Sequence, residues 1–166
     1  MIVSGAPGAG KSTLAGPLAE RLGLPLIGKD HIKETLYDNI PAGPDRAAWS
    51  KILGGASMEL LWKLASLAPA AVLEANFRPH SDYERGKLVA LSAPLVEVYC
   101  HCPPELAAER FAARHPQRHP THVSSEISLQ YLAEFDRPMA LGPVIEVDTS
   151  AAVDVAALAD AVRAAF

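Results

Sequence analysis

The glycine-rich segment near the N-terminus constrains the fold of this chain more than any other feature. It reads Gly5-Ala6-Pro7-Gly8-Ala9-Gly10-Lys11-Ser12. This is the complete pattern Gly-x4-Gly-Lys-Ser, in which glycines let backbone N–H groups converge on phosphate oxygens without Cβ clashes. The pattern belongs between a strand and a helix; here the apolar residues 1–3 precede it and leucines at 14, 18 and 22 follow it. The segment therefore predicts a loop that binds nucleotide phosphates at a helix N-terminus.

Each part of this loop has an expected role. Lys11 is expected to reach the β- and γ-phosphates of ATP, and the Ser12 hydroxyl is expected to ligate Mg²⁺. The predicted nucleotide-binding residues of the loop are Gly5, Ala6, Pro7, Gly8, Ala9, Gly10, Lys11, Ser12 and Thr13. An ordinary glycine-rich turn is the alternative interpretation, but such a turn does not require the whole pattern. Kinases, GTP-dependent switches, motor ATPases and transporters all use this loop, so it leaves the chemistry open.

Short apolar segments alternate with helical ones along the whole chain. We expect strands at residues 1–3, 24–27, 70–73, 95–100 and 144–147. We expect helices at 11–22, 31–38, 45–67, 81–91, 105–114, 125–135 and 153–166. This alternation favours a three-layer α/β fold, with a parallel sheet covered by helices on both faces. With 166 residues and no internal repeat or linker, the chain is expected to form one domain over residues 1–166.

Local signals mark several helix ends and one break. Asp45 is expected to cap the long helix, and Ser81 the next one, with Glu84 as the second half of a capping box. Thr149 is one candidate for the cap of the last helix. Pro17 is expected to bend the first helix, because proline removes a backbone hydrogen bond there.

Composition narrows the classes of partner and compartment. The net charge is −4, so no broad basic field attracts nucleic acid. No apolar run reaches membrane-spanning length, and the phosphate loop begins too early to leave room for a signal peptide. The two cysteines, Cys100 and Cys102, form no disulfide framework. We therefore expect a cytoplasmic protein, monomeric or weakly dimeric, that binds neither membranes nor nucleic acid.

Three further segments, taken with the phosphate loop, carry a resemblance to a known family. They are Leu26-Ile27-Gly28-Lys29-Asp30-His31-Ile32-Lys33, Val72-Leu73-Glu74-Ala75-Asn76-Phe77, and Tyr99-Cys100-His101-Cys102-Pro103-Pro104-Glu105-Leu106 followed by Arg110 and Arg114. Over nearly its whole length the chain resembles the small P-loop kinases of AAA type, which include chloramphenicol phosphotransferase, gluconate kinase, the polynucleotide kinase domain and zeta toxins. The resemblance implies a P-loop NTPase fold with strand order 2-3-1-4-5 and an arginine-bearing lid at about residues 110–125. It also implies ATP- and Mg²⁺-dependent transfer of the γ-phosphate to a hydroxyl group of a small molecule.

Asp30 is the residue that the resemblance identifies as the catalytic base. It follows the second strand, and the carboxyl ends of parallel strands surround the bound phosphates in such sheets. A carboxylate at that edge can orient an alcohol in line with the γ-phosphorus and take its proton late in the reaction. The competing interpretation is that Asp30 merely caps the helix that starts at His31.

The end of the third strand supplies further candidates for the acceptor and metal sites. The family commonly has aspartate where this chain has Glu74, so we expect Glu74 to hold Mg²⁺ through a water molecule rather than directly. Asn76 is a candidate substrate ligand or a turn residue. Arg78 and Arg85 are candidate substrate contacts, with solvated surface charge as the alternative for both.

The lid is expected to supply cations for the transferring phosphoryl group. Arg110 and Arg114 lie four residues apart, so both are expected on one helix face, where paired guanidinium groups neutralise phosphoryl charge. Arg110 is also a predicted nucleotide contact, and Arg118 a weaker substrate candidate. A surface i,i+4 pattern is the alternative. The histidines at 115, 119 and 122 suggest a metal site, but they lack a carboxylate or cysteine at ligand spacing, so a polar lid loop is the better interpretation.

The acceptor itself stays open at this point. Antibiotics, sugars, nucleosides and shikimate-like alcohols all fit, and the pocket is expected between residues 40–56, 76–83 and the lid. A nucleotide-sugar kinase of the zeta-toxin kind and a nucleic-acid end kinase are the alternative enzymes. A nucleotide-binding switch ATPase is the alternative outside the kinases, although no Asn-Lys-x-Asp segment for GTP appears.

Overall fold

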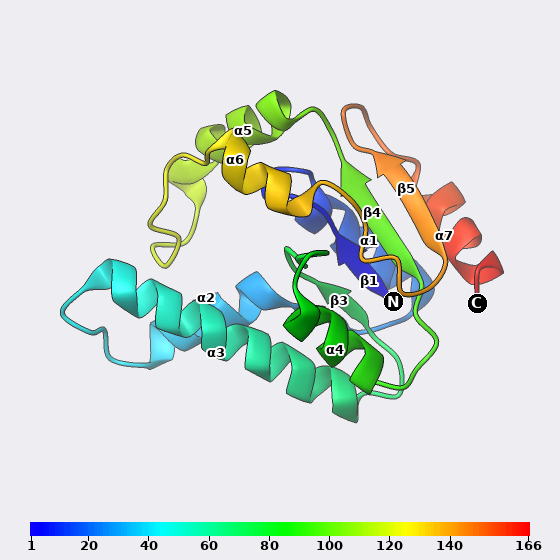
Figure 1. The fold of residues 1–166 in the computed structure, drawn as a ribbon, viewed down its shortest axis with the longest axis horizontal. Coiled ribbons are helices and arrows are strands. Elements are labelled where there is room, and N and C mark those ends of the chain that lie inside the picture. Colours follow the sequence, from blue (N-terminus) through cyan, green and yellow to red (C-terminus); the bar gives the residue numbers. More distant parts are fainter.

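A five-stranded parallel sheet forms the middle of the computed structural model, which describes all 166 residues. Its strands are β1 (Ile2–Ser4), β2 (Leu26–Gly28), β3 (Val72–Glu74), β4 (Glu97–His101) and β5 (Val144–Asp148). They lie in the order β2-β3-β1-β4-β5. Figure 1 shows β3, β1, β4 and β5 side by side in that order. This confirms the expected α/β fold and strand order. Three of the strands have only three residues, so the side chains on both faces of the sheet must supply most of its stability.

Seven α-helices and two 3₁₀ turns surround the sheet. The α-helices are α1 (Lys11–Leu22), α2 (Lys29–Asn39), α3 (Arg46–Leu67), α4 (Asp82–Ala90), α5 (Pro104–Ala113), α6 (Leu129–Leu132) and α7 (Val155–Ala164). The 3₁₀ turns are η1 (His115–Gln117) and η2 (Ala133–Phe135). No helix combines the length and apolar character that a membrane crossing needs.

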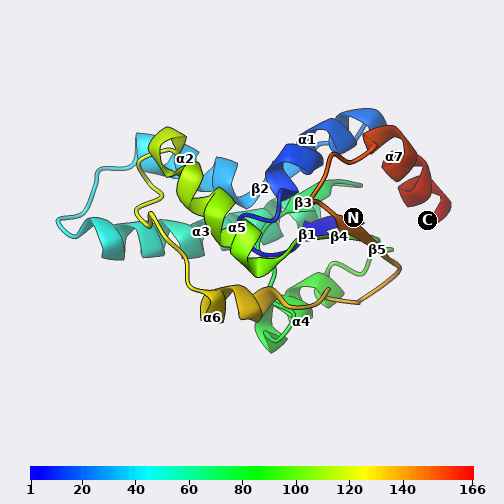
Figure 2. The same ribbon diagram turned by 90° about the horizontal axis from the view of Figure 1, so that it is seen from above.

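Two apolar clusters, one on each face of the sheet, form the core. Val3 and Val72 face α1 and α7, where Leu18 and Val162 complete one cluster. The residues next to them in sequence, such as Ile2, face the opposite way and pack against α3 and α4. Neighbouring strand residues point to opposite faces, so two three-residue strands serve both clusters. Figure 2 shows the resulting layers, with α1 and α7 on one side of the sheet and α4 on the other.

Several helix ends lie where local signals predict, and others differ. Asp45 accepts hydrogen bonds from Ala47 N and Ala48 N, and Ser81 accepts one from Glu84 N, which confirms both caps. The Glu84 carboxylate does not complete a capping box, because it accepts from Arg78 N instead. The last helix is capped by Asp154 rather than Thr149.

Two predicted helices also differ from expectation, one in its interior and one at its start. Helix α1 runs unbroken through Pro17, whose ring lies on the exposed side while Leu14 and Leu18 pack on the core. The helix predicted at 125–135 begins only at Leu129, because the Ser128 hydroxyl accepts from Tyr131 N and caps it there. Residues 125–128 are thereby left free to line a cavity.

A buried carboxylate ties the sheet to the segment before β5. Glu97 is fully buried, and its oxygens accept hydrogen bonds from Ser4 Oγ at 2.5 Å, Met139 N at 2.9 Å and Ala140 N at 2.9 Å. Ala140 has a positive φ of 50°, an uncommon conformation for a residue with a side chain. The carboxylate therefore holds a strained turn against the first residue of β4.

We expect Glu97→Gln to destabilise the protein by about 1–3 kcal/mol, because the amide N–H₂ faces donors and leaves at least one of them unsatisfied. Urea unfolding followed by circular dichroism measures the change. Glu146→Gln on the neighbouring strand, where the side chain is exposed, is the matched control and should change stability by less than about 0.5 kcal/mol. Equal effects of the two substitutions would contradict this role of Glu97.

Candidate active site

The phosphate loop adopts a conformation that only glycine tolerates at two of its positions. Gly5 and Gly8 have φ values of 128° and 85°. A Cβ atom on Gly5 would lie 2.1 Å from the carbonyl oxygen of Cys100, and one on Gly8 would lie 2.1 Å from that of Ala107. The loop therefore packs directly on the ends of β4 and α5. The loop ends at Lys11, where α1 begins. The free N–H groups at the N-terminus of α1 form a site that can bind an anion.

Lys11 is a buried cation inside this loop. Its side chain is buried, and Nζ donates to the Ala6 carbonyl at 2.7 Å. Burial lowers the pKa of Lys11, and the neighbouring Glu74 carboxylate offsets part of that effect. No carboxylate lies within ion-pair distance of Nζ. A buried ammonium group beside free helix N–H groups fits a polyphosphate.

Ser12 and Glu74 meet at the edge of the sheet beside the loop. Glu74 is the last residue of β3 and lies opposite Gly28 of β2 and Val3 of β1. The Ser12 hydroxyl donates to Glu74 Oε1 at 3.2 Å. Burial raises the pKa of Glu74, against the opposing effect of Lys11. A hydroxyl and a carboxylate are oxygen ligands of the kind that Mg²⁺ binds, so this pair fits the metal.

Asp30 lies in the first turn of α2 and faces the same edge. The helix starts one residue earlier, at Lys29, with Gly28 at the cap position, so the interpretation of Asp30 as the helix cap is wrong. Lys29 Nζ lies 3.1 Å from Asp30 Oδ1. Burial by itself would raise the pKa of Asp30, but Lys29, His122 and Arg118 outweigh it and lower the pKa to about 2. Asp30 is therefore an ionised carboxylate at neutral pH.

Two cavities flank the phosphate loop and meet across it. The first, which we call the acceptor cavity, has a volume of about 460 Å³ and contains Lys11, Ser12, Asp30, Glu74 and Asn76 in its lining. The second, the nucleoside cavity, has a volume of about 530 Å³ and is bordered by Gly10, Thr13, Leu14, Arg110 and residues 149–153. Gly8 and Arg114 line both. The two cavities are therefore neighbours at these two residues.

The three arginines of the predicted lid serve different parts of this arrangement. Arg110 donates to the carbonyl oxygens of Thr149 at 3.0 Å and Ser150 at 3.3 Å, and it lines only the nucleoside cavity. Arg114 follows the end of α5 and lies where the cavities meet. Arg118 lines the acceptor cavity but not the nucleoside cavity, and its guanidinium carbon lies 4.7 Å from the centre of the Phe111 ring. The predicted Arg110–Arg114 pair is thus divided, because the carbonyls after β5 hold Arg110 away.

Two predicted substrate contacts lie elsewhere. Arg78 forms ion pairs with Glu84 at 3.3 Å and Glu134 at 3.1 Å, and Arg85 donates to the Met139 carbonyl at 2.6 Å. Neither lines the acceptor cavity. Both instead connect α4 and the residues after β3 to the segment that precedes β5. No local sequence pattern distinguishes such a structural arginine from one on the solvent-exposed surface.

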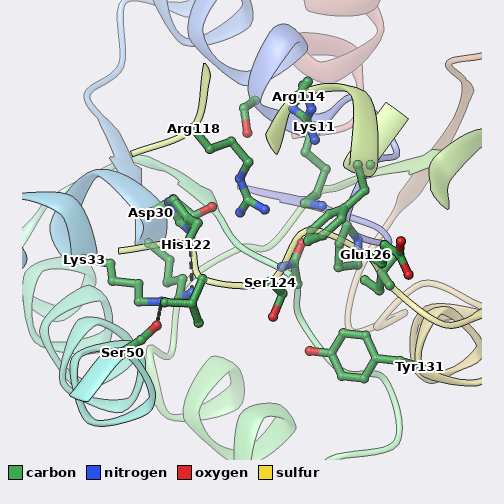
Figure 3. Close-up of a pocket in the computed structure, with 18 of the residues that line it drawn as sticks. Lys11, Asp30, Lys33, Ser50, Arg114, Arg118, His122, Ser124, Glu126 and Tyr131 are labelled. Carbon is green, nitrogen blue, oxygen red and sulfur yellow. Dashed lines mark hydrogen bonds and ion pairs between the residues drawn. The ribbon is translucent and has the colours of Figure 1, made fainter. Parts of the chain in front are cut away.

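The acceptor cavity also contains residues that sequence reasoning did not single out. Figure 3 shows several of them: Lys33 from α2, Ser50 from α3, and Ser124, Glu126 and Tyr131 from the segment after η1. His122, one of the histidines of the predicted lid loop, lies beside Asp30. Lys33 was detectable in principle, since three residues after Asp30 is the same helix face. The others reach the cavity only through packing between distant segments. Of the expected pocket segments, 40–56 contributes only Ser50 and 76–83 none beyond Asn76.

The histidines of this segment pair with α2. His119 Nε2 lies 3.0 Å from Asp38 Oδ1, and His122 Nε2 lies 3.0 Å from Glu34 Oε1. Burial lowers the pKa of His122, although Asp30 and Glu34 oppose this effect. These contacts hold residues 115–122 over α2 and close one side of the acceptor cavity.

Known proteins share this fold over the full length of the chain. A proposed kinase from Chloroflexus aurantiacus J-10-fl is 27% identical, with a TM-score of 0.85 and coverage of 99% of this chain and 97% of that one. Shikimate kinase from Acinetobacter baumannii, solved with shikimate, is 20% identical, with a TM-score of 0.63 and coverage of 98% and 89%. Kti12 from Chaetomium thermophilum, solved with ADP-AlF3, is 16% identical, with a TM-score of 0.63 and coverage of 99% and 97%. At these identities the last two show the fold alone.

The family comparison covers most of the sequence. No curated protein sequence matches the chain significantly. The model of the AAA domain family AAA_33 matches residues 1–138, from β1 through the end of the segment that lines the acceptor cavity. The chain has the nucleotide-binding P-loop and the kinase-like sheet order on which the resemblance rests. It therefore belongs to the AAA_33 family of AAA domains, among the small P-loop kinase-like proteins.

Proposed function

We propose that this protein is an ATP- and Mg²⁺-dependent phosphotransferase that moves the γ-phosphate to a hydroxyl group of a small molecule. One observation carries the proposal. The nucleoside cavity and the acceptor cavity meet across the phosphate loop at Gly8 and Arg114, and an ionised carboxylate, Asp30, lines the acceptor side. A protein that only binds a nucleotide does not need a carboxylate beyond the phosphates, and a hydrolase needs room for water alone rather than a cavity of about 460 Å³.

The donor side follows from the phosphate loop. Residues 5–13 hold the phosphates through backbone N–H groups, and Lys11 neutralises part of their charge. Ser12, with Glu74 acting through a water molecule, would hold Mg²⁺, which would supply further charge neutralisation. The purine lies in the nucleoside cavity, where Leu14 and residues 151–153 offer apolar contact and Arg110 presents a fixed planar guanidinium group.

Asp30 orients the acceptor and receives its proton. The acceptor oxygen forms a bond to the γ-phosphorus while the bond from phosphorus to the β,γ-bridging oxygen breaks, and ADP leaves. The proton of the hydroxyl passes to Asp30 and then to water. With a pKa near 2, Asp30 is a weak base, so it takes the proton only after the new P–O bond has largely formed. Arg114, at the junction of the cavities, neutralises the charge that develops on the phosphoryl group.

The size and lining of the acceptor cavity favour a small polar acceptor. Its volume of about 460 Å³ lies within the usual range for small-molecule sites, and only four of its 20 lining residues are hydrophobic. Hydroxylated metabolites, sugars, nucleosides and polar antibiotics match this description better than a large apolar alcohol. The chain's net charge of −4 disfavours a nucleic-acid strand as acceptor.

We expect Lys11→Met to abolish ATP binding without lowering the stability of the ligand-free protein. The substitution removes the cation that contacts the phosphates, and it also removes the desolvation cost of a buried charge. Differential scanning fluorimetry tests both effects. At an ATP concentration about 100 times Kd, the wild type should gain about 2.7 kcal/mol and the variant nothing. Lys63→Met, at an exposed position of α3, should retain the full gain; an unchanged ATP response in Lys11→Met would contradict the assignment.

We expect Asp30→Asn to bind ATP normally but to lower kcat about 10²- to 10⁴-fold, because the amide neither takes the proton nor orients the alcohol equally well. ADP formation against a panel of hydroxylated metabolites and antibiotics measures kcat, and fluorimetry with ATP measures binding. Asp82→Asn is the control, since Asp82 is exposed on α4 and lies outside the acceptor cavity. Near-normal turnover by Asp30→Asn would refute its role as the base.

A further inference from the structure

Lys33 is a buried lysine in the acceptor cavity that the transfer step does not use. It lies on α2 three residues beyond Asp30, and only 7% of it is exposed. Its Nζ donates to Ser50 Oγ at 2.8 Å and to the Thr121 carbonyl at 3.4 Å. Both partners are neutral, and no carboxylate lies within ion-pair distance. An ammonium group has three N–H donors, so one of them remains for a ligand in the cavity.

Such a cation is costly to maintain without a counter-charge. Buried lysines are normally paired, because an isolated charge loses its hydration on burial. Burial here lowers the pKa of Lys33 to about 8, with Lys29 and Arg118 acting in the same direction and Asp30 and Glu34 against it. The side chain thus keeps its proton at neutral pH. This charge therefore has no anionic partner within ion-pair distance, and it borders the cavity.

Arg118 is a second cation in the same part of the cavity. Its guanidinium group stacks on Phe111 and has no hydrogen-bonded carboxylate or carbonyl partner. Burial lowers the pKa of Arg118, and Asp30 opposes that effect. Figure 3 shows Arg118 and Lys33 on the side of the cavity where Asp30 lies, with Glu126 on the opposite side.

The remaining charges of the cavity, apart from Glu126, already have partners or roles in the proposed transfer step. Lys29 is paired with Asp30, Glu74 accepts from Ser12, and Lys11 lies in the phosphate loop. Glu126 is exposed. Lys33 and Arg118 are thus left without an anionic partner beside the proposed base. A neutral acceptor would not change this, whereas an anion would form charge-assisted hydrogen bonds with both.

We propose that the phosphate acceptor carries an anionic group, a carboxylate or a phosphate ester, which Lys33 and Arg118 bind while a hydroxyl of the same molecule faces Asp30. The inference rests on the proposed phosphotransferase activity and specifies its substrate class. Asp30 and Lys33 lie three residues apart on one face of α2, so the anionic group and the reacting hydroxyl belong to the same small molecule. Small hydroxy acids and sugar phosphates carry both groups.

Matched pairs of acceptors test the proposal directly. D-gluconate is compared with D-glucose, quinate with its methyl ester, and D-ribose 5-phosphate with D-ribose, by ATP consumption and by thermal shift in the presence of ADP. The anionic member of a pair should have a kcat/KM roughly 10- to 100-fold higher than the neutral member, the size expected for one hydrogen bond between charged groups. The carboxylate and phosphate pairs distinguish the two kinds of anion.

Variants then separate recognition of charge from a structural role of Lys33. Lys33→Met should raise KM for the anionic members roughly 10- to 100-fold while kcat and the KM for ATP stay within about twofold. The neutral members should be unaffected, and Lys33→Arg should restore part of the preference. Arg118→Met provides a second variant at a half-buried position. Lys51→Met, exposed on α3 next to Ser50, should behave as the wild type.

Each outcome bears on one of the two proposals. A preference for neutral members, or an equal loss toward both members in Lys33→Met, overturns the anion site and leaves the phosphotransferase intact. If no acceptor is turned over but the anionic compounds produce a thermal shift that depends on Lys33, the anion site is supported and the proposed phosphotransferase activity is overturned. Absence of both turnover and shift overturns both.

Discussion

The direct contact between the phosphate loop and its neighbours is the constraint on which the rest of the site depends. Gly5 packs on the carbonyl of Cys100 at the end of β4, and Gly8 packs on that of Ala107 within α5. Neither contact leaves room for a Cβ atom. The loop therefore holds α5 at a set distance from the phosphate site. Through α5 it places Arg110 beside the nucleoside cavity and Arg114 where the two cavities adjoin.

The parallel sheet supplies the other half of the site through its register. Gly28, Glu74 and Val3 lie opposite one another on β2, β3 and β1. The residues that follow these positions leave the sheet at the same edge, which brings Asp30, Glu74 and the phosphate loop together although they are far apart in the chain. Short strands suffice for this purpose, because the two apolar clusters and the buried Glu97 carboxylate fix the sheet from its faces and its far end.

Two of the buried ionic residues outside the phosphate loop, Glu97 and Lys33, differ in a way that separates structure from function. The Glu97 carboxylate accepts hydrogen bonds from three donors and does not line either cavity. Lys33 has two neutral acceptors and borders a cavity that also contains Arg118. A buried charge with a structural role needs all of its hydrogen-bonding groups paired, because an unpaired buried charge destabilises the folded chain. An incomplete set of partners facing a cavity indicates a group that a ligand completes.

The sequence by itself determined the fold class, the bounds of α1 and α3, the caps at Asp45 and Ser81, and the place of the phosphate loop. These features depend on periodicity, capping and turn chemistry, which act over a few residues. Tertiary structure alone decided that Glu84 bonds Arg78, that Arg110 turns to the carbonyls after β5, and that Lys33, Ser50 and residues 122–131 share a cavity with Asp30. Those outcomes depend on which donors and acceptors, distant in the sequence, come within hydrogen-bond distance once the layers pack. A local sequence pattern gives no information on such distances.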